Sequence, residues 1–361
     1  MRPFSSSSRS RSLRAVTALA MIPLLAALAA CSPASASKGD SGPADALRLG
    51  YFANVTHAPA LVGVSKGLFA KELGKTKLKT QVFNAGPAAI EALNANAIDA
   101  AFLGPSPAIN GFIKSHGESL QIISGSTSGG AQLVVRPGIK TAADLKGAEL
   151  ATPQLGGTQD VALRSWLTSK GLKNSISGGG DVTITPTDNA QTLQLFQDGK
   201  IDGAWLPEPW ASRLVVDANA KVLVDEKDLW AGGKFLTTNL IVSKKFLGEH
   251  PATVEALLRG TVDSVDWLKA NPKDAPGVVN AEIAKTAGKP LSDAVLARAF
   301  TNISFSVDPL AGTLDKLLAA GVTAGTTEKA SLDGIYDLRL LNKVLKEKGQ
   351  PAVSSAGLGQ E

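Results

Sequence analysis

The sequence predicts an α/β fold in which two similar lobes enclose a ligand cleft. From about residue 46 to residue 245, short apolar runs alternate with helical patterns, which is typical of α/β organisation. Ser-Lys-Gly-Leu at 65–68 recurs at 169–172, and Ile98–Leu103 recurs in similar form as Ile201–Leu206. Two matches with nearly one spacing, of about 100 residues, indicate a duplicated unit. The length of 361 residues fits two lobes at roughly 100–200 residues per domain.

The first thirty residues are interpreted as a lipoprotein signal peptide. Three arginines (Arg9, Arg11, Arg14) precede an apolar run, 15–30, that is interrupted only by Thr17 and Pro23. The run is short for a membrane span of roughly 20 residues. It ends in Leu-Ala-Ala-Cys, which resembles a lipobox, and Cys31 is the single cysteine. The alternative is an ordinary signal peptide followed by an incidental cysteine.

These features predict export through the general secretory route, because the segment contains no Arg-Arg pair. Cleavage would leave a lipidated Cys31 at the N-terminus. Residues 31–45, rich in Ser, Ala, Gly and Pro, would form a flexible tether. The expected location is the outer face of the cell membrane, or its periplasmic side.

Composition excludes several classes of protein. A hydrophobic fraction of 44% excludes a largely disordered chain. One cysteine excludes a disulfide framework and a cysteine zinc site, and three histidines leave little room for another metal centre, so we expect neither metal nor cofactor. Of the net charge of +5, four units come from arginines in 1–30, a segment without acids. The remainder is nearly neutral and has no nucleic-acid footprint.

The elements expected from apolar periodicity follow in chain order. Strands are expected at 47–52, 78–83, 98–103, 120–124, 132–135, 149–152, 181–185, 201–206, 221–224 and 236–242. Helices are expected between them at 58–66, 87–94, 106–115, 158–170, 189–198 and 208–217. Beyond residue 250 the pattern is nearly all helical, at 253–270, 274–286, 292–300, 312–320 and 335–348.

Four loops that follow predicted strands suit the binding of an anion. The loops 53–59, 84–88, 104–107 and 156–160 each place glycine, proline or a hydroxyl at the start of a helix. Ligands of α/β sheets lie beyond the carboxyl ends of the strands. A helix N-terminus presents unpaired N–H groups and favours an anion by roughly 0.3–1 kcal/mol. The alternative is that these loops are ordinary helix caps, but their convergence on one cleft favours an anion site.

Two residues after the strand at 201–206 leave alternatives open. Glu208 either accepts a hydrogen bond from an amine or hydroxyl of the ligand, or complements the first turn of its own helix. Trp210 either stacks on the ligand or closes the lobe. His57 is the only histidine on a predicted cleft loop.

No motif for catalysis is present. The sequence contains no Gly-x-Ser-x-Gly, no phosphate-binding P-loop and no His-Glu-x-x-His, and Gly-Gly-Thr-Gln-Asp at 156–160 lacks the third glycine of a dinucleotide site. We therefore expect a binding protein rather than an enzyme.

The chain resembles the substrate-binding proteins of ABC importers for aliphatic sulfonates, nitrate and taurine, the SsuA/THI5-like group. Matching segments are Leu47–Tyr51, Ser65–Phe69, Asp144–Gly147 and Ile201–Trp210. The resemblance implies a type II periplasmic-binding-protein fold, in which two lobes joined by two hinge crossings close on the ligand. The crossings would lie near 131–135 and 236–240. Lobe 1 would then be 46–133 and 237–361, and lobe 2 would be 134–236.

The resemblance also implies a function and a site. The function is capture of a small organic anion, an aliphatic sulfonate first, for ABC permease subunits and their ATPase; the protein is expected to be a monomer. Alternatives are nitrate, taurine or a vitamin precursor as the solute, or a tethered sensor. An enzyme related to a pyrimidine synthase is the least favoured reading, because that branch uses a cysteine-rich segment. The ligand contacts implied are Asn54, Thr56, His57, Gly86, Ser106, Ser126, Thr127, Gly157, Thr158, Gln159, Glu208, Trp210, Thr238 and Asn239.

Overall fold

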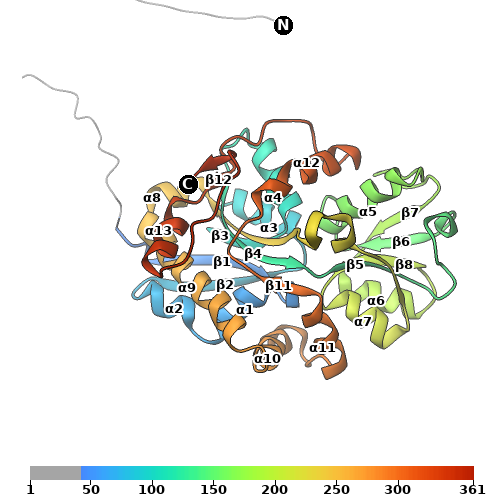
Figure 1. Ribbon diagram of the computed structural model, residues 1–361, viewed down its shortest axis with the longest axis horizontal. Helices are drawn as coiled ribbons and strands as arrows, with labels where there is room; N and C mark the ends of the chain where they lie inside the picture. The colour runs from blue at the N-terminus through green and yellow to red at the C-terminus, as the bar shows by residue number, and fades with distance from the viewer. Residues whose placement is uncertain (1–41) are drawn as a thin grey trace, which may run out of the picture. The chain divides into compact units, whose positions relative to one another are not determined.

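The computed structural model describes residues 42–361 and contains two β-sheets with helices packed around them (Figure 1). The eight-stranded sheet, sheet A, holds β1 (Ala46–Phe52), β2 (Lys77–Phe83), β3 (Ala100–Leu103), β4 (Leu120–Gly129), β10 (Leu236–Ser243), β11 (Ile303–Phe305), β12 (Tyr336–Asp337) and β13 (Gly359–Gln360). The five-stranded sheet, sheet B, holds β5 (Ala131–Val135), β6 (Glu149–Thr152), β7 (Thr183–Pro186), β8 (Gly203–Pro207) and β9 (Lys221–Asp225).

The helices fall into three groups along the chain. Those between the strands of sheet A are α1 (Ala58–Ser65), α2 (Leu68–Leu73), α3 (Gly86–Asn94) and α4 (Pro105–Lys114). Those between the strands of sheet B are α5 (Thr158–Ser169), α6 (Asn189–Gln197) and α7 (Trp210–Ala218). The rest are α8 (Lys244–Glu249), α9 (Pro251–Ala270), α10 (Ala275–Ala287), α11 (Asp293–Thr301), α12 (Leu314–Thr323) and α13 (Arg339–Glu347).

The two sheets share one strand order. Sheet A contains β2-β1-β3-β10-β4 and sheet B contains β7-β6-β8-β5-β9, and in each the three strands on one side are parallel while the next is antiparallel. The repeated Ile-Asp sequence takes the same place in both. Asp99 accepts a hydrogen bond from the Arg48 N–H on β1, and Asp202 accepts one from the Glu149 N–H on β6. The predicted duplication is therefore confirmed in topology.

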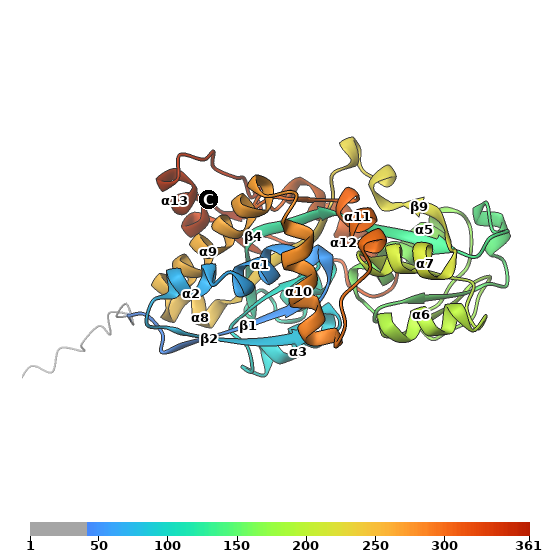
Figure 2. The same cartoon turned by 90° about the horizontal axis from the view of Figure 1, so that it is seen from below.

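The chain passes from sheet A to sheet B between Gly129 and Ala131 and returns between Asp225 and Leu236. The C-terminal helices then contact both parts: α9 packs on α1 and α2, whereas α11 packs on α7 and α12 on α5 (Figure 2). The largest hydrophobic core lies around sheet A, and two smaller cores are built on sheet B. This arrangement places the carboxyl ends of β1, β2, β3 opposite those of β6, β7, β8.

The predicted α/β class is confirmed, and the ten expected strands occur within about three residues of their predicted starts. The C-terminal part contradicts the expectation of nearly continuous helix. β11, β12 and β13 join sheet A, and the helix expected at 335–348 begins only at Arg339, because Tyr336 and Asp337 form a strand beside β4 and β13. The short helices α2 and α8 were not predicted.

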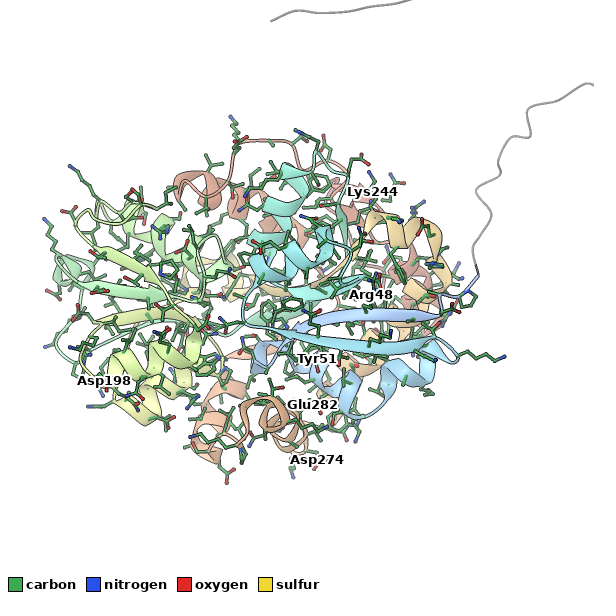
Figure 3. The ribbon with its side chains drawn as sticks, turned by 180° about the vertical axis from the view of Figure 1, so that it is seen from behind. Arg48, Tyr51, Asp198, Lys244, Asp274 and Glu282 are labelled. Carbon is green, nitrogen blue, oxygen red and sulfur yellow. The ribbon has the colours of Figure 1, made fainter. Side chains whose placement is uncertain are left out.

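The signal peptide and Cys31 lie outside the described residues. Packing begins before the predicted end of the tether: Ala44 is buried, and its N–H donates to Thr253 Oγ1 at 2.9 Å. Arg48 lies nearby at the surface of β1 (Figure 3), where its Nε donates to Asp99 at 2.9 Å. Within residues 42–361, none of the helices has the length and apolarity needed to span a membrane.

Candidate functional site

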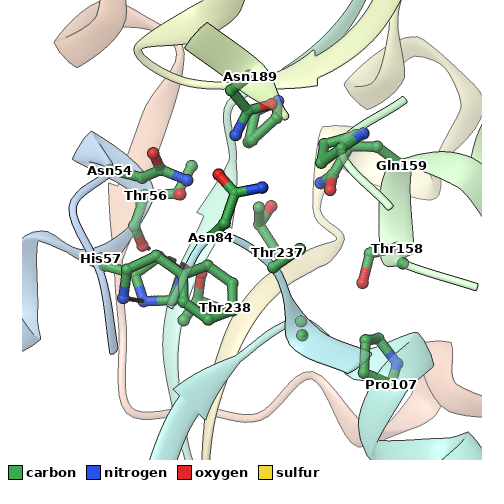
Figure 4. Close-up of a pocket in the computed structure, with 17 residues that line it drawn as sticks. Asn54, Thr56, His57, Asn84, Pro107, Thr158, Gln159, Asn189, Thr237 and Thr238 are labelled. Carbon is green, nitrogen blue, oxygen red and sulfur yellow. Dashed lines mark hydrogen bonds between the residues drawn. The ribbon is translucent and has the colours of Figure 1, made fainter. Parts of the chain in front are cut away.

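A cavity lies between the two sheets (Figure 4). In the figure, Asn54, Thr56 and His57 face Thr158 and Gln159 across it. Both parts of the protein contribute, because the cavity lies at the carboxyl ends of the parallel strands of each sheet. Its lining consists of Phe52, Asn54, Thr56, His57, Asn84, Ala85, Gly86, Gly104, Pro107, Pro153, Gly157, Thr158, Gln159, Asn189, Pro207, Thr237 and Thr238.

Five helices begin at this cavity. The helices α1, α3 and α4 start on the side of sheet A, each with proline in its first turn. The helices α5 and α6 start on the side of sheet B. None of these five starts has a side-chain hydrogen bond from its capping residue. The first N–H groups of α3, α4, α5 and α6 have no capping side chain as acceptor, whereas the Ala58 N–H of α1 donates to the Val55 carbonyl and Pro59 has no N–H. The helix dipoles favour a negative charge in the cavity.

The lining side chains of the cavity include no Lys, Arg, Asp or Glu. His57 carries no charge either, because burial lowers its pKa to about 3. Its Nδ1 accepts the Phe52 N–H at 3.3 Å, so the hydrogen of the neutral ring is on Nε2. The ring packs on Phe52 with 4.2 Å between the centroids. His57 is thus a fixed neutral donor, and the positive potential of the cavity comes from helix ends.

Two lining polar atoms are buried without a partner. They are Thr158 Oγ1, in the first turn of α5, and Asn189 Oδ1, in the first turn of α6. A buried polar atom without a hydrogen bond costs about 1–3 kcal/mol. These two atoms are therefore available to a ligand that fills the cavity.

Hydrogen bonds across the cleft fix the orientation of two lining amides. Trp210 Nε1 donates to Asn54 Oδ1 at 2.8 Å. Because an indole N–H can only donate, this bond fixes which end of the amide is the oxygen, and the Asn54 NH₂ group remains free to donate. Asn84 Nδ2 donates to the Asp188 carboxylate at 2.5 Å, which leaves Asn84 Oδ1 as a free acceptor. The cavity therefore contains one fixed amide donor and one fixed amide acceptor.

The two sides also touch directly. A Cβ placed on Gly104, before α4, would lie 2.2 Å from Thr158 Oγ1 and 3.1 Å from Thr158 Cβ. Together with the bonds of Asn54 and Asn84, this contact shows that the cleft is closed in the structure.

Eight of the fourteen residues predicted as ligand contacts line the cavity. These are Asn54, Thr56, His57, Gly86, Gly157, Thr158, Gln159 and Thr238. The remaining six are Ser106, Ser126, Thr127, Glu208, Trp210 and Asn239, and they are absent from the lining. Four of these six (Ser106, Ser126, Thr127 and Asn239) are buried and have side-chain polar atoms without a hydrogen-bond partner.

The structure does not support the prediction that Glu208 contacts the ligand. Its side chain is fully buried, and its carboxylate accepts hydrogen bonds from the Ser212 N–H at 3.0 Å, Asn302 Nδ2 at 2.7 Å and Arg298 at 3.1 Å. Burial raises the pKa of Glu208, and these partners oppose the increase. The alternative interpretation was that Glu208 complements the first turn of its own helix. It is correct in part, since one carboxylate oxygen accepts the Ser212 N–H in the first turn of α7.

Trp210 does not line the cavity because its indole is used elsewhere. Its Nε1 bonds Asn54, and the Arg213 guanidinium lies 4.7 Å from the ring centroid. Trp210 instead lines a larger groove that shares Asn54 and Asn84 with the cavity and that also contacts α6, α10 and α11.

Sequence reasoning missed Asn84, Asn189 and Thr237 as lining side chains. Asn189 is the first residue of α6, the position that the predicted contact Gly86 holds in α3, and this equivalence was the available signal for Asn189. Asn84 directly follows β2. Thr237 lies on β10 beside the predicted Thr238. In residues 42–361, no group of three or more His, Cys, Asp and Glu side chains is placed to bind a metal ion.

Comparisons with known proteins agree with this architecture. The NMT1-like family matches residues 40–284. An aliphatic sulfonates-binding protein of Escherichia coli K12 is 27% identical over 250 residues, which cover 68% of this chain and 73% of that protein.

Solved structures with the same fold include two solute-binding proteins. The alkanesulfonate-binding protein SsuA from Xanthomonas axonopodis pv. citri, bound to MOPS, has a TM-score of 0.66 at 22% identity, covering 79% of this chain and 95% of that one. The nitrate-binding protein NrtA from Synechocystis PCC 6803 has a TM-score of 0.64 at 15% identity, covering 84% and 89%.

Proposed function

The chain belongs to the NMT1-like family, and on this premise we propose that it is the extracytoplasmic solute-binding component of an ABC importer. The proposed solute is a small organic anion, an aliphatic sulfonate first. The observation that carries the proposal is the cavity of neutral donors on which five helix N-termini converge, none of them with a side-chain hydrogen bond from its capping residue. Named relatives that bind sulfonates or nitrate support it. The protein is a binding protein and not an enzyme.

Binding in this mechanism is closure of the two lobes around the solute. Donors from the side of sheet A include His57 Nε2–H and the Asn54 amide, and donors from the side of sheet B include the Thr158 hydroxyl. Closure excludes water, and hydrogen bonds to an anion are strengthened in the resulting low-dielectric site. The closed form would then be the one recognised by the permease subunits, which with their ATPase are the proposed partners.

The two passages between the sheets are proposed as the hinge. They lie at Gly129–Ala131 and between Asp225 and Leu236, close to the crossings implied by the resemblance. Lobe 1 would comprise 46–133 and 237–361, and lobe 2 would comprise 134–236. Both boundaries would move by a few residues, because as given they divide the strands β5 and β10.

A panel of solutes tests the class. We expect alkanesulfonates to raise the melting temperature of the purified protein, because a ligand at about one hundred times its Kd stabilises by roughly 2.7 kcal/mol. The panel includes ethanesulfonate, taurine, nitrate, bicarbonate, sulfate, and thiamine and flavin precursors. Thr158→Ala should weaken the binding of any active anion by about tenfold, since it removes a buried donor. A response to a heterocyclic precursor alone would contradict the anion proposal.

An amine-bearing anion such as taurine is the second candidate. Asn84 Oδ1 is a fixed acceptor and Asn189 Oδ1 is unpartnered, so a solute that also donates hydrogen bonds would satisfy both atoms. Tighter binding of taurine than of ethanesulfonate would favour this candidate. Equal binding would favour the plain sulfonate.

The lipid anchor at Cys31 is a further part of the proposal, and it rests on the sequence alone. We expect the wild-type protein to fractionate with membranes and to need detergent for release. Cys31→Ser should release it into the soluble exported fraction, because the thiol that accepts the lipid is lost. A Cys31→Ser protein that still needs detergent for release would contradict lipidation.

A further inference from the structure

The carboxylate of Glu208 is the centre of a buried polar cluster that joins distant parts of the chain. Arg298 on α11 donates through Nη1 to Glu208 Oε1 at 3.1 Å and to Ser212 Oγ at 2.8 Å, and through Nη2 to Gln132 Oε1 at 2.6 Å. Asn302 donates to the same Glu208 oxygen at 2.7 Å. Gln132 belongs to β5 and Ser212 to α7, so one guanidinium connects α11 to a strand of sheet B and to a helix that packs on that sheet.

The backbone of Glu208 reaches the cleft. Its N–H donates to the Gly130 carbonyl at 2.8 Å, at the first passage between the sheets. Its carbonyl accepts the Thr56 N–H at 3.3 Å, and Thr56 lines the cavity, as does the preceding Pro207. Glu208 therefore links α11 to the first passage and to one wall of the cavity.

The cost of burying this carboxylate shows why Arg298 matters. The Glu208 side chain is 0% exposed, whereas that of Arg298 is 22% exposed. A buried carboxylate that loses its cationic partner is strongly destabilised. The segment around Glu208 would respond by moving toward water, and its two backbone hydrogen bonds at the cleft would weaken.

We propose that Arg298 is a positioning residue for solute binding: through Glu208 it holds the segment 207–210 against the cleft loop 54–57. This role rests on the solute-binding function proposed above and adds to it, because Arg298 is not among the residues that line the cavity. The α11 helix thereby acts as a third, non-covalent connection between the lobes beside the two chain passages.

Hydrogen exchange of the purified protein without solute tests the positioning. In Arg298→Met we expect exchange to accelerate by about tenfold in peptides covering 53–57 and 207–212, with 149–165 of the same sheet unchanged, because opening is local. Arg298→Lys keeps the charge but not the planar fork and should be intermediate. Glu208→Gln in the Arg298→Met background should restore most of the protection, because no unpaired charge remains.

Affinity provides the second measurement, with ethanesulfonate as the probe. Arg298→Met should weaken binding by about tenfold, since a smaller fraction of molecules holds the binding-competent wall. The matched control is Arg259→Met, which breaks the ion pairs of Arg259 with Glu255 on α9 and Glu347 on α13. This variant should change neither the exchange of the cleft peptides nor the affinity.

The outcomes separate this inference from the proposed function. Local acceleration at 53–57 and 207–212 supports positioning even if ethanesulfonate does not bind the wild type, in which case only the proposed solute fails. Acceleration spread evenly over all peptides, or no acceleration in the two cleft peptides, would overturn the role of Arg298.

Discussion

Gly104→Ala is expected to lower solute affinity by about one hundredfold while leaving the fold intact. The added Cβ would lie 2.2 Å from Thr158 Oγ1 and 3.1 Å from Thr158 Cβ, so rotating the hydroxyl alone does not relieve the contact. Gly104 has φ −73° and ψ 158°, which alanine adopts freely. The substitution therefore opposes closure, not folding. If only about 1% of the molecules are closed, the apparent affinity falls about one hundredfold. Isothermal titration with the panel compound that binds the wild type measures the loss.

Two further variants show whether the contact is the cause. Gly248→Ala places a methyl group where no atom lies within 4 Å, on α8, and it should bind as the wild type does. Gly104→Ala should cost less in a Thr158→Ala background, because the 2.2 Å contact with Oγ1 is gone while the 3.1 Å contact with Cβ remains, and two substitutions at one contact are not additive. Full additivity of the two losses would mean that the lobes do not meet at this point when the solute is bound.

The cleft could be located from sequence because its determinants are local. A strand followed by glycine or proline at a helix start is a pattern of a few adjacent residues, and the repeat places such patterns in both sheets. For this reason Asn54, Gly86, Gly157 and Thr158, which were predicted as ligand contacts, lie in the lining of the cavity. Strands with apolar runs, such as β1 and β8, were located by the same local signal.

Features that depend on distant partners could not be predicted. Glu208 follows a strand at the edge of the cleft, yet its carboxylate is bound by Arg298 and Asn302, about 90 residues later in the chain. Nothing within a few positions of Glu208 indicates these partners. The strands β12 and β13 have two residues each, too few to show a period. β12 forms because β4 offers it an edge, and β13 in turn pairs with β12.

Asp160→Ala is expected to lower the free energy of unfolding by about 3–5 kcal/mol, the usual cost of leaving one partner of a buried ion pair alone. The Asp160 carboxylate is fully buried on α5 and accepts Arg164 Nε at 3.0 Å from both oxygens. It also accepts the Thr152 hydroxyl at 2.9 Å and the Gly156 N–H at 3.0 Å. One carboxylate therefore forms hydrogen bonds with β6, with the loop before α5 and with the helix itself. Urea unfolding followed by tryptophan fluorescence measures the loss of stability in Asp160→Ala.

The control for Asp160 is a pair with the same i,i+4 spacing in solvent. Arg213 and Asp217 on α7 lie 3.5 Å apart, with 20% and 34% of their side chains exposed. Asp217→Ala should therefore cost less than about 1 kcal/mol. Replacing Arg164 by leucine in the Asp160→Ala protein should recover part of the loss, because the isolated buried cation is removed. Equal costs for Asp160→Ala and Asp217→Ala would show that burial does not set the strength of the α5 pair, and that the loop before α5 is held by other contacts.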